Sequence, residues 1–145
     1  MVHAENLHSA SALSGKQQCI VSIASFTAKG DTEKLKEALA EGLRNGMTVN
    51  EIREVLIQMY AYTGFPRNLT CLNTFIALLD ERNAQDIHDE LGRDAAPLPD
   101  TVNIRELGTA NQTAVLGRPA DGRVYEIAPV IDTFLKEHFS RHLQP

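Results

Sequence analysis

One segment constrains the fold more than any other part of the sequence: GMTVNEIREVLIQMYAYTGFPRNL, residues 46–69. Thr48 and Glu51 have the spacing of a capping box, in which each side chain binds the backbone N–H of the other residue at the start of a helix. Gly64 is typical of the position that follows a helix, and Pro66 is well tolerated in the first turn of the next helix. The segment therefore predicts two helices joined by a tight corner at Phe65.

Apolar residues recur at helical spacing through most of the chain, and no alternating strand pattern is present. Besides the two helices at the corner, we expect helices over residues 13–29, 31–45, 101–116 and 129–143. In the second helix the expected core stripe is Leu35, Ala38, Leu39, Gly42 and Leu43; in the fourth it is Leu69, Leu72, Ile76 and Leu79. The sequence thus predicts an all-α fold of about six helices.

The length of 145 residues suits one compact domain. We expect a single domain over residues 1–145, with a helical core at 13–84 and C-terminal helices at 101–143. The polar stretch 85–100, with Pro97 and Pro99, is expected to be a linker around a short turn of helix.

Charge and composition exclude several classes of function. The net charge is −5, whereas a nucleic-acid-binding domain needs a basic surface. No apolar run approaches the ~20 residues of a membrane span, and the N-terminus does not read as a signal peptide. Two cysteines, Cys19 and Cys71, are interpreted as free thiols of a cytoplasmic protein. His138 and His142 are spaced to share a metal ion, but no third ligand is evident, so no metal site is predicted.

Three pieces of the sequence resemble the carboxymuconolactone decarboxylase family. They are LSGKQQCIVSIASFTAKG, LKEALAEGLRNGMTVNEIREVLIQMYAYTGFPRNLTCLNTF and, more loosely, IAPVIDTFLKEHF. The resemblance implies an alkylhydroperoxidase D-like helical fold that assembles into homo-oligomers, either trimers or hexamers. One branch of the family decarboxylates γ-carboxymuconolactone in aromatic catabolism, and another reduces peroxides with a Cys-x-x-Cys pair and a histidine. Some relatives continue into a second copy after the FLKEH segment, so this chain looks like a single-copy member.

The sequence also departs from the family pattern. The redox cysteine pair would fall near Asp31 and Lys34, and the usual histidine near Ala38. A dithiol peroxidase relay runs on a thiolate pair, so this departure excludes that chemistry. The usual histidine acid or base is missing as well.

Candidate substrate-binding residues gather around the corner. Arg67 is a cation in the first turn of a helix, where free backbone N–H groups and a guanidinium together make a receiver for a carboxylate. An ion pair or plain exposure is the alternative for this residue. Cys71 follows by one helical turn, where a cation could lower its pKa, although a lone helical cysteine is more often a core residue. Tyr60 and Phe65 are candidate walls for a flat ligand, or packing residues.

The flank of the third helix carries the candidate catalytic residues. Glu51, Gln58 and Tyr62 share one side of the helix, which leads toward the corner. Glu51 would act as a proton carrier and Tyr62, with Gln58, would orient the substrate. Near neutral pH this role requires a Glu51 pKa raised by burial. The alternative is a boundary stripe in which Glu51 has only its capping function.

The leading hypothesis is therefore a cofactor-independent lyase, similar to the decarboxylase, that acts on a small carboxylate or lactone. The alternative is a non-catalytic binding or assembly domain with the same fold, which the missing family residues favour. A thiol peroxidase that uses Cys71 with Cys19 is a third hypothesis.

Overall fold

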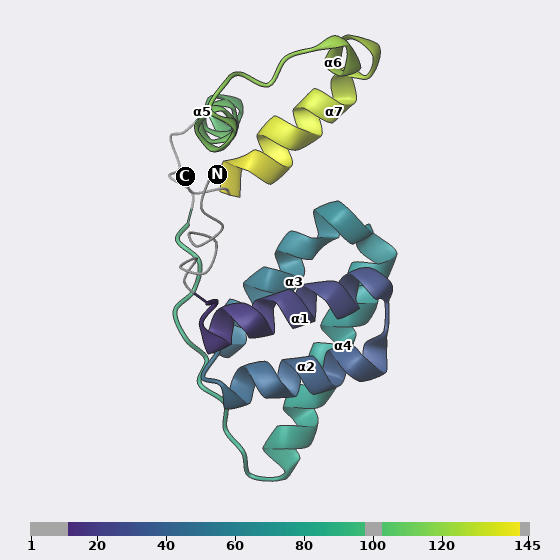
Figure 1. Cartoon of the computed structure of the whole chain (residues 1–145), viewed down its shortest axis with the longest axis vertical. Coiled ribbons are helices and arrows are strands. Elements are labelled where there is room, and N and C mark those ends of the chain that lie inside the picture. Colours follow the sequence, from purple (N-terminus) through teal and green to yellow (C-terminus); the bar gives the residue numbers. More distant parts are fainter. Residues whose placement is uncertain (1–11, 98–102, 143–145) are drawn as a thin grey trace, which may run out of the picture. The chain divides into compact units, whose positions relative to one another are not determined.

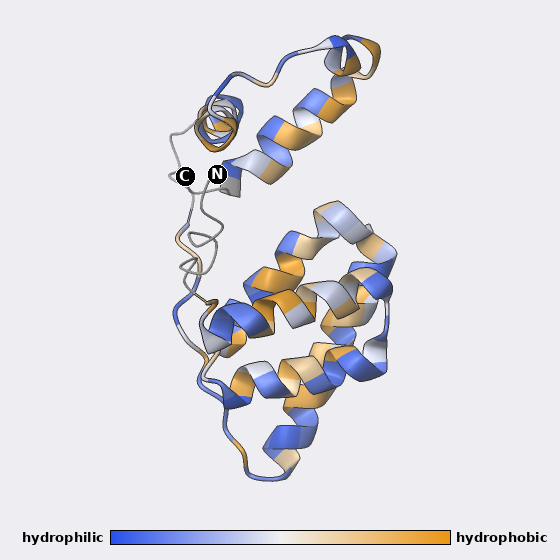
Figure 2. Ribbon diagram, viewed as in Figure 1, coloured by the Kyte–Doolittle hydropathy of each residue, from blue (hydrophilic) through white to orange (hydrophobic). Residues whose placement is uncertain are grey.

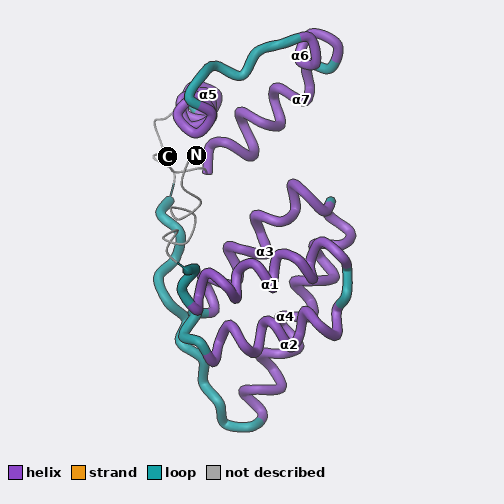
Figure 3. Tube along the Cα trace, in the orientation of Figure 1, coloured by secondary structure: helices purple, strands orange, loops and turns teal. Residues whose placement is uncertain are grey.

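The computed structural model describes residues 12–97 and 103–142, and the described residues are helical with no strand (Figure 3). They form seven α-helices, followed by a π-helical and a 3₁₀ segment at the C-terminal end. The all-α prediction is confirmed, with one short helix more than expected. The chain divides into two compact units, residues 1–95 and 96–145, which we describe separately. The expected single domain stays a prediction.

The N-terminal unit contains four helices: α1 (Gly15–Lys29), α2 (Thr32–Arg44), α3 (Val49–Thr63) and α4 (Phe65–Ala84) (Figure 1). α1 packs against α2 and α3, and α4 packs against the same two helices. The predicted capping box of α3 is present: Thr48 Oγ1 accepts from the Glu51 N–H, and the Glu51 carboxylate accepts from the Thr48 N–H. Local signals therefore place the ends of the helices where the sequence predicts them.

α2 contributes more residues to the core of this unit than any other helix. All five residues of the expected α2 stripe are buried, and Leu35 and Leu39 are fully inaccessible. Figure 2 shows the apolar residues of α1, α3 and α4 in orange. The buried apolar residues of the unit are Cys19, Ile23, Leu35, Ala38, Leu39, Leu43, Met47, Ile52, Leu56, Cys71, Phe75 and Leu78.

The buried face of α4 is displaced by one residue from the expected one, although Leu72 and Leu79 of the expected face are partly buried and pack against the core. The face that enters the core carries Asn68, Cys71, Phe75 and Leu78, whereas Leu69 and Ile76 are more than half exposed. Asn68 is only 4% exposed because its Nδ2 donates to the backbone oxygen of Leu56 at 2.5 Å. This hydrogen bond allows a polar residue on the core side, so α4 has an apolar row on each of two adjacent faces.

An extended segment follows α4 and returns to the start of α3. The Glu90 and Leu91 carbonyls accept from the N–H groups of Val49 and Asn50, both at 2.9 Å. These contacts satisfy donors that the first turn of a helix otherwise leaves free. The short turn of helix expected in this linker is absent from the described residues 87–97.

The C-terminal unit is a helical hairpin. Its first arm is α5 (Ile104–Leu116), and its second arm follows the short helix α6 (Arg123–Ile127). The second arm was expected as one helix over 129–143; it is instead α7 (Pro129–Thr133), a π-helical turn over 134–139 and a 3₁₀ turn over 140–142. Sequence analysis missed α6. None of the helices in the described residues is long and apolar enough to cross a bilayer.

Candidate functional site

A cavity of about 500 Å³ lies beside the predicted corner, between the end of α1 and the start of α4. We call it the Arg67 cavity. This volume is within the range of small-molecule sites. Its wall consists of Lys29, Gly30, Thr32, Thr63, Pro66, Arg67, Thr70 and Cys71.

Local backbone geometry holds the Arg67 side chain at this cavity. α1 ends at Gly30, which adopts the left-handed conformation with φ 73°. Arg67 Nη1 donates to the Ala28 carbonyl at 2.5 Å, so the negative end of the α1 dipole faces the guanidinium. A Cβ on Gly30 would lie 3.2 Å from Arg67 Nε, which explains why a glycine suits this close approach. The other guanidinium donors have no partner among the described residues, and they remain available to a ligand.

The wall of the Arg67 cavity is electropositive. It contains two cations, Lys29 and Arg67, and no carboxylate among the described residues that line it. Gly64 has no side chain that could cap α4, so the N–H groups of Phe65 and Arg67 lack a side-chain partner. Cations and free N–H groups at a helix start favour an anionic ligand. The carboxylate-binding role predicted for Arg67 therefore coincides with a cavity whose wall is positively charged.

Cys71 lines the same cavity but is not an activated thiol. Cys71 is fully buried, and this burial raises the pKa of its thiol. The neighbouring Thr27 hydroxyl and the Arg67 charge lower the pKa, but their effect is smaller. The lowered pKa considered from sequence is thus wrong, and Cys71 is a neutral wall residue at neutral pH.

The aromatic candidates lie together but outside this wall. The rings of Tyr60 and Phe65 stack with their centroids 5.2 Å apart and their planes inclined by 21°. Phe65 and Tyr62 are mostly exposed, and Gln58 is half-buried. None of these four residues lines the Arg67 cavity. Their substrate contacts stay predictions.

Glu51 lies at the other end of α3 from the corner. The helix has 15 residues, with Glu51 in its first turn and Thr63 at its end, so roughly 18 Å separate Glu51 from the Arg67 cavity. The Glu51 carboxylate is half exposed and pairs with Lys16 Nζ at 3.0 Å. The Thr48 N–H, followed by Lys16, lowers its pKa. This corrects the expectation of a proton carrier with a raised pKa: hydrogen bonds to the charged form outweigh the slight burial.

We expect the capping carboxylate of Glu51 to make the free energy of unfolding decrease at acidic pH. A lowered pKa in the folded state means that the carboxylate stabilises the fold at neutral pH, where it is charged in both states. That contribution disappears as the pH falls below about 4.5, through the pKa of the folded state. Urea unfolding at pH 7 and pH 3.5 should therefore show a smaller loss of stability for Glu51→Gln than for the parent. Glu37→Gln, which changes an exposed carboxylate on α2, is the control; equal acid sensitivity of the Glu51 variant and the parent would contradict the assignment.

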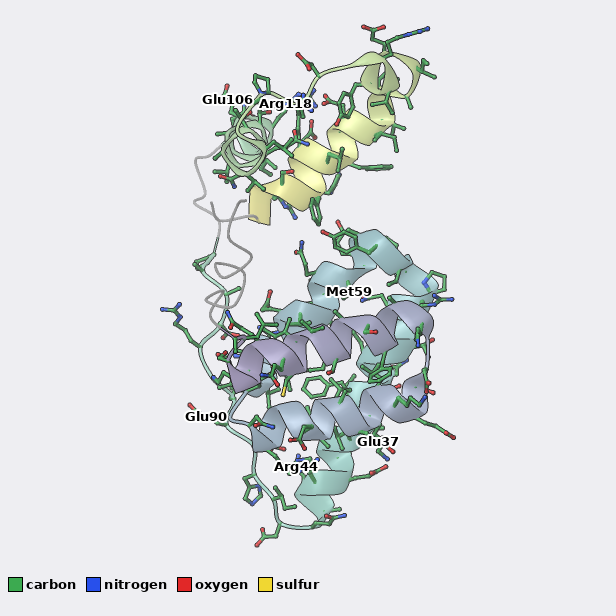
Figure 4. The ribbon with its side chains drawn as sticks, viewed as in Figure 1. Glu37, Arg44, Met59, Glu90, Glu106 and Arg118 are labelled. Atoms are coloured by element: carbon green, nitrogen blue, oxygen red, sulfur yellow. The ribbon has the colours of Figure 1, made fainter. Side chains whose placement is uncertain are left out.

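Two further cavities lie in the N-terminal unit. The first, of about 450 Å³ between α1 and α2, is lined by Cys19, Lys34 and Ala38. Glu37 and Arg44, both labelled in Figure 4, also line it. Lys34 and Ala38 are the positions at which the resemblance would place a redox cysteine and the histidine. The second, of about 480 Å³, is lined by Glu51 and by Glu90 of the extended segment. Charges of both signs line each of these cavities, unlike the Arg67 cavity.

One comparison with known proteins places this chain in a family. The sequence profile of the carboxymuconolactone decarboxylase family (CMD) matches residues 1–75 of this chain. The chain therefore belongs to that family, as the resemblance indicates. No curated protein and no solved structure matches the sequence.

Sequence reasoning assigned only Arg67 and Cys71 of this wall to the site and missed the other six residues: Lys29, Gly30, Thr32, Thr63, Pro66 and Thr70. Lys29 and Thr32 flank the turn between α1 and α2, far from Arg67 in the sequence. The packing of α1 and α2 against α4 brings them to the corner. Thr70 follows Pro66 by one helical turn, and its Oγ1 donates to the Pro66 carbonyl at 3.1 Å, so its spacing was the one available signal.

Proposed function

We propose that this protein is a cofactor-independent lyase of the decarboxylase type, and that it acts on a small carboxylate or lactone in the Arg67 cavity. One observation supports this proposal most. The chain carries a net charge of −5, yet this cavity has two cations and no acidic side chain on its described wall. An anionic ligand would satisfy donors that are otherwise unpaired.

The main contribution that the proposed decarboxylation requires from the protein is stabilisation of the developing negative charge. When a carboxylate leaves as CO₂ from the saturated ring carbon next to the C=C bond of an unsaturated lactone, the C–C bond breaks and its electron pair passes through that C=C bond toward the lactone carbonyl. Negative charge then develops on the carbonyl oxygen, and a ring carbon later takes a proton from water. Arg67, Lys29 and the free N–H groups of α4 would stabilise that charge, which is the largest contribution in many enzymes.

Replacing Arg67 with alanine is expected to weaken carboxylate binding by roughly tenfold to a hundredfold. The reason is the loss of a charge-assisted hydrogen bond, which contributes about 1.5–3 kcal/mol. Binding is measured by calorimetry with γ-carboxymuconolactone and related small carboxylates, and turnover by release of CO₂. Arg67→Lys should keep part of the affinity, because lysine retains the positive charge but lacks the planar guanidinium that donates two parallel hydrogen bonds.

Arg93→Ala is the matched control, because it removes an exposed cation from the cavity beside Glu51 and changes the net charge equally. Equal affinities of the two alanine variants for every carboxylate would overturn the carboxylate site. Turnover that persists unchanged in Arg67→Ala would overturn its catalytic role.

A second candidate function is a non-catalytic small-molecule-binding or assembly domain. Three observations weaken an acid–base role and so favour this function. The resemblance places the family's histidine near Ala38, which lines a different cavity, the pKa of Cys71 is raised, and Glu51 lies at the far end of α3. A rise in melting temperature on addition of the carboxylate, without product, would support this function. A thiol peroxidase is disfavoured because Cys71 and Cys19 line different cavities and the Cys71 thiol is neutral. Assembly into a homo-oligomer stays a prediction.

A further inference from the structure

The extended segment after α4 borders a second cavity of the N-terminal unit, at the start of α3. Besides the backbone contacts of Glu90 and Leu91, the Asn50 Nδ2 donates to the Gly92 carbonyl at 3.0 Å. A Cβ on Gly92 would lie 2.2 Å from Thr48 Oγ1, so the segment lies directly against the first turn of α3. The cavity beside this contact has a volume of about 480 Å³, and we call it the Asn50 cavity.

Asn50 has a buried acceptor atom without a donor. The residue lines the cavity and is only 1% exposed. Its Nδ2 donates to the Gly92 carbonyl and, at 3.2 Å, to Asp94 Oδ1, and these two bonds fix the orientation of the amide. The Oδ1 atom has no hydrogen-bond partner among the described residues. Because an unpaired buried oxygen costs free energy, this position favours a ligand that brings an N–H donor.

Carboxylates outnumber cations on the wall of the Asn50 cavity. The wall contains four acidic residues, Glu51, Glu54, Glu90 and Asp94, and two basic ones, Lys16 and Arg93. Lys16 pairs with Glu51 at 3.0 Å, and Arg53, which is not part of the wall, pairs with Glu54 and Asp94. Glu90, labelled in Figure 4, has no ion-pair partner among the described residues. Its carboxylate is therefore available to a cationic ligand.

Apolar side chains complete this wall. Ile20, Met47 and Ala95 line the cavity together with the carboxylates. A small inorganic cation keeps its water and gains nothing from such a surface, whereas a hydrocarbon chain gains free energy when it leaves water there. A carboxylate, a buried acceptor and apolar side chains in one cavity therefore favour a ligand with a cationic head and an alkyl chain.

We propose that the Asn50 cavity binds a primary alkylammonium ion. The ammonium group pairs with Glu90 and donates to Asn50 Oδ1, while the alkyl chain packs on Ile20 and Met47. Because Oδ1 has almost no accessible surface, this contact requires a small movement of the extended segment. The site lies at the opposite end of α3 from the Arg67 cavity and selects the opposite charge, so it does not depend on the proposed lyase function.

An NMR titration of the ¹⁵N-labelled full chain with butylammonium chloride at pH 7 tests the site. We expect saturable shifts of the Asn50 side-chain NH₂ and of the Gly92 backbone N–H, with a dissociation constant on the order of 1 mM for so small a ligand. 1-Butanol supplies the chain without the charge, and potassium chloride supplies a cation without the chain. Neither should saturate these signals. Equal responses to either compound, or butylammonium shifts that leave Asn50 and Gly92 unchanged, would overturn the proposal.

Three variants separate the Glu90 contact from the general charge of the protein. Glu90→Gln removes the carboxylate but keeps the backbone carbonyl that binds α3, and it should raise the dissociation constant of butylammonium at least threefold. Glu33→Gln removes an exposed carboxylate of α2 outside the cavity wall and should leave the constant unchanged. Arg93→Ala removes a like charge from the wall and should lower the constant about twofold.

The outcomes for these variants are distinct. Equal constants for Glu90→Gln and Glu33→Gln would overturn the pairing with Glu90. Weaker binding by Arg93→Ala would show that the cavity prefers an anion, which would overturn the proposal as a whole. Loss of carboxylate binding at Arg67 would leave all of these results unaffected, so the two sites can fail separately.

Discussion

Replacing Gly108 with alanine is expected to open the C-terminal hairpin. Alanine normally stabilises the interior of a helix by about 1 kcal/mol relative to glycine. Here the new Cβ would overlap the backbone carbonyl of Lys136, which cannot move aside as a flexible side chain can. The arms must separate, which costs at least about 1–3 kcal/mol and disrupts the Arg105–Asp132 and Asn111–Ser140 contacts. Hydrogen exchange followed by mass spectrometry should show loss of protection in residues 104–116 and 129–142.

Thr109→Ala is the control, because it changes the next residue of α5 on the exposed side of the helix. That variant should keep the protection of the parent or gain slightly, as alanine is the better helix former. If Gly108→Ala showed the same protection as Thr109→Ala, the close approach of α5 to the second arm would be refuted.

Leu39→Ala should cause the largest loss of stability in the N-terminal unit. Leu39 is fully inaccessible on α2, at the centre of the core cluster to which α1, α3 and α4 also contribute. Truncation of a buried leucine removes packing and leaves a cavity, at a cost of about 2–5 kcal/mol. Because small domains have a stability of only about 5–15 kcal/mol, urea unfolding should show a much lower midpoint with an unchanged slope.

The comparison for this prediction is Leu69→Ala on α4, where the same chemical change occurs at a residue that is 57% exposed. Its cost should be within about 0.5 kcal/mol of zero. Similar losses in both variants would mean that α4 buries its other apolar row, the one expected from sequence.

The helices of the N-terminal unit could be predicted because their signals are local. The capping box at Thr48, the glycine at 64 and the apolar stripe of α2 each act within a few residues, so no knowledge of packing was needed. The buried face of α4 could not be predicted in this way. Its two rows differ by one residue, and the row that is buried contains Asn68, whose hydrogen bond to the Leu56 carbonyl is a tertiary contact that the sequence does not show.

The residues of the candidate site likewise divide into those that local sequence signals indicate and those that only tertiary packing brings together. Arg67 was found because a cation in the first turn of a helix is unfavourable by itself and thus suggests an anion. Glu51 has two readings from sequence, a cap and a proton carrier, and its pairing with Lys16 at 3.0 Å favours the cap. Lys29 could not be assigned, because its place beside Arg67 results from tertiary packing. In the C-terminal hairpin the apolar spacing correctly indicated a helix, but not that its polar side would be buried.

The one-residue corner at Gly64 has a consequence for how the chain tolerates changes in length. Gly64 is the C-cap of α3 and also the N-cap of α4, so no further linker residue separates the two helices. Removal of one residue there would turn α4 by about 100° and bring the row Leu69, Leu72, Ile76 and Leu79 to the positions of Asn68, Cys71, Phe75 and Leu78. Such a deletion would yield a compact, mispaired bundle instead of an unfolded chain, with Arg67 rotated away from the Ala28 carbonyl.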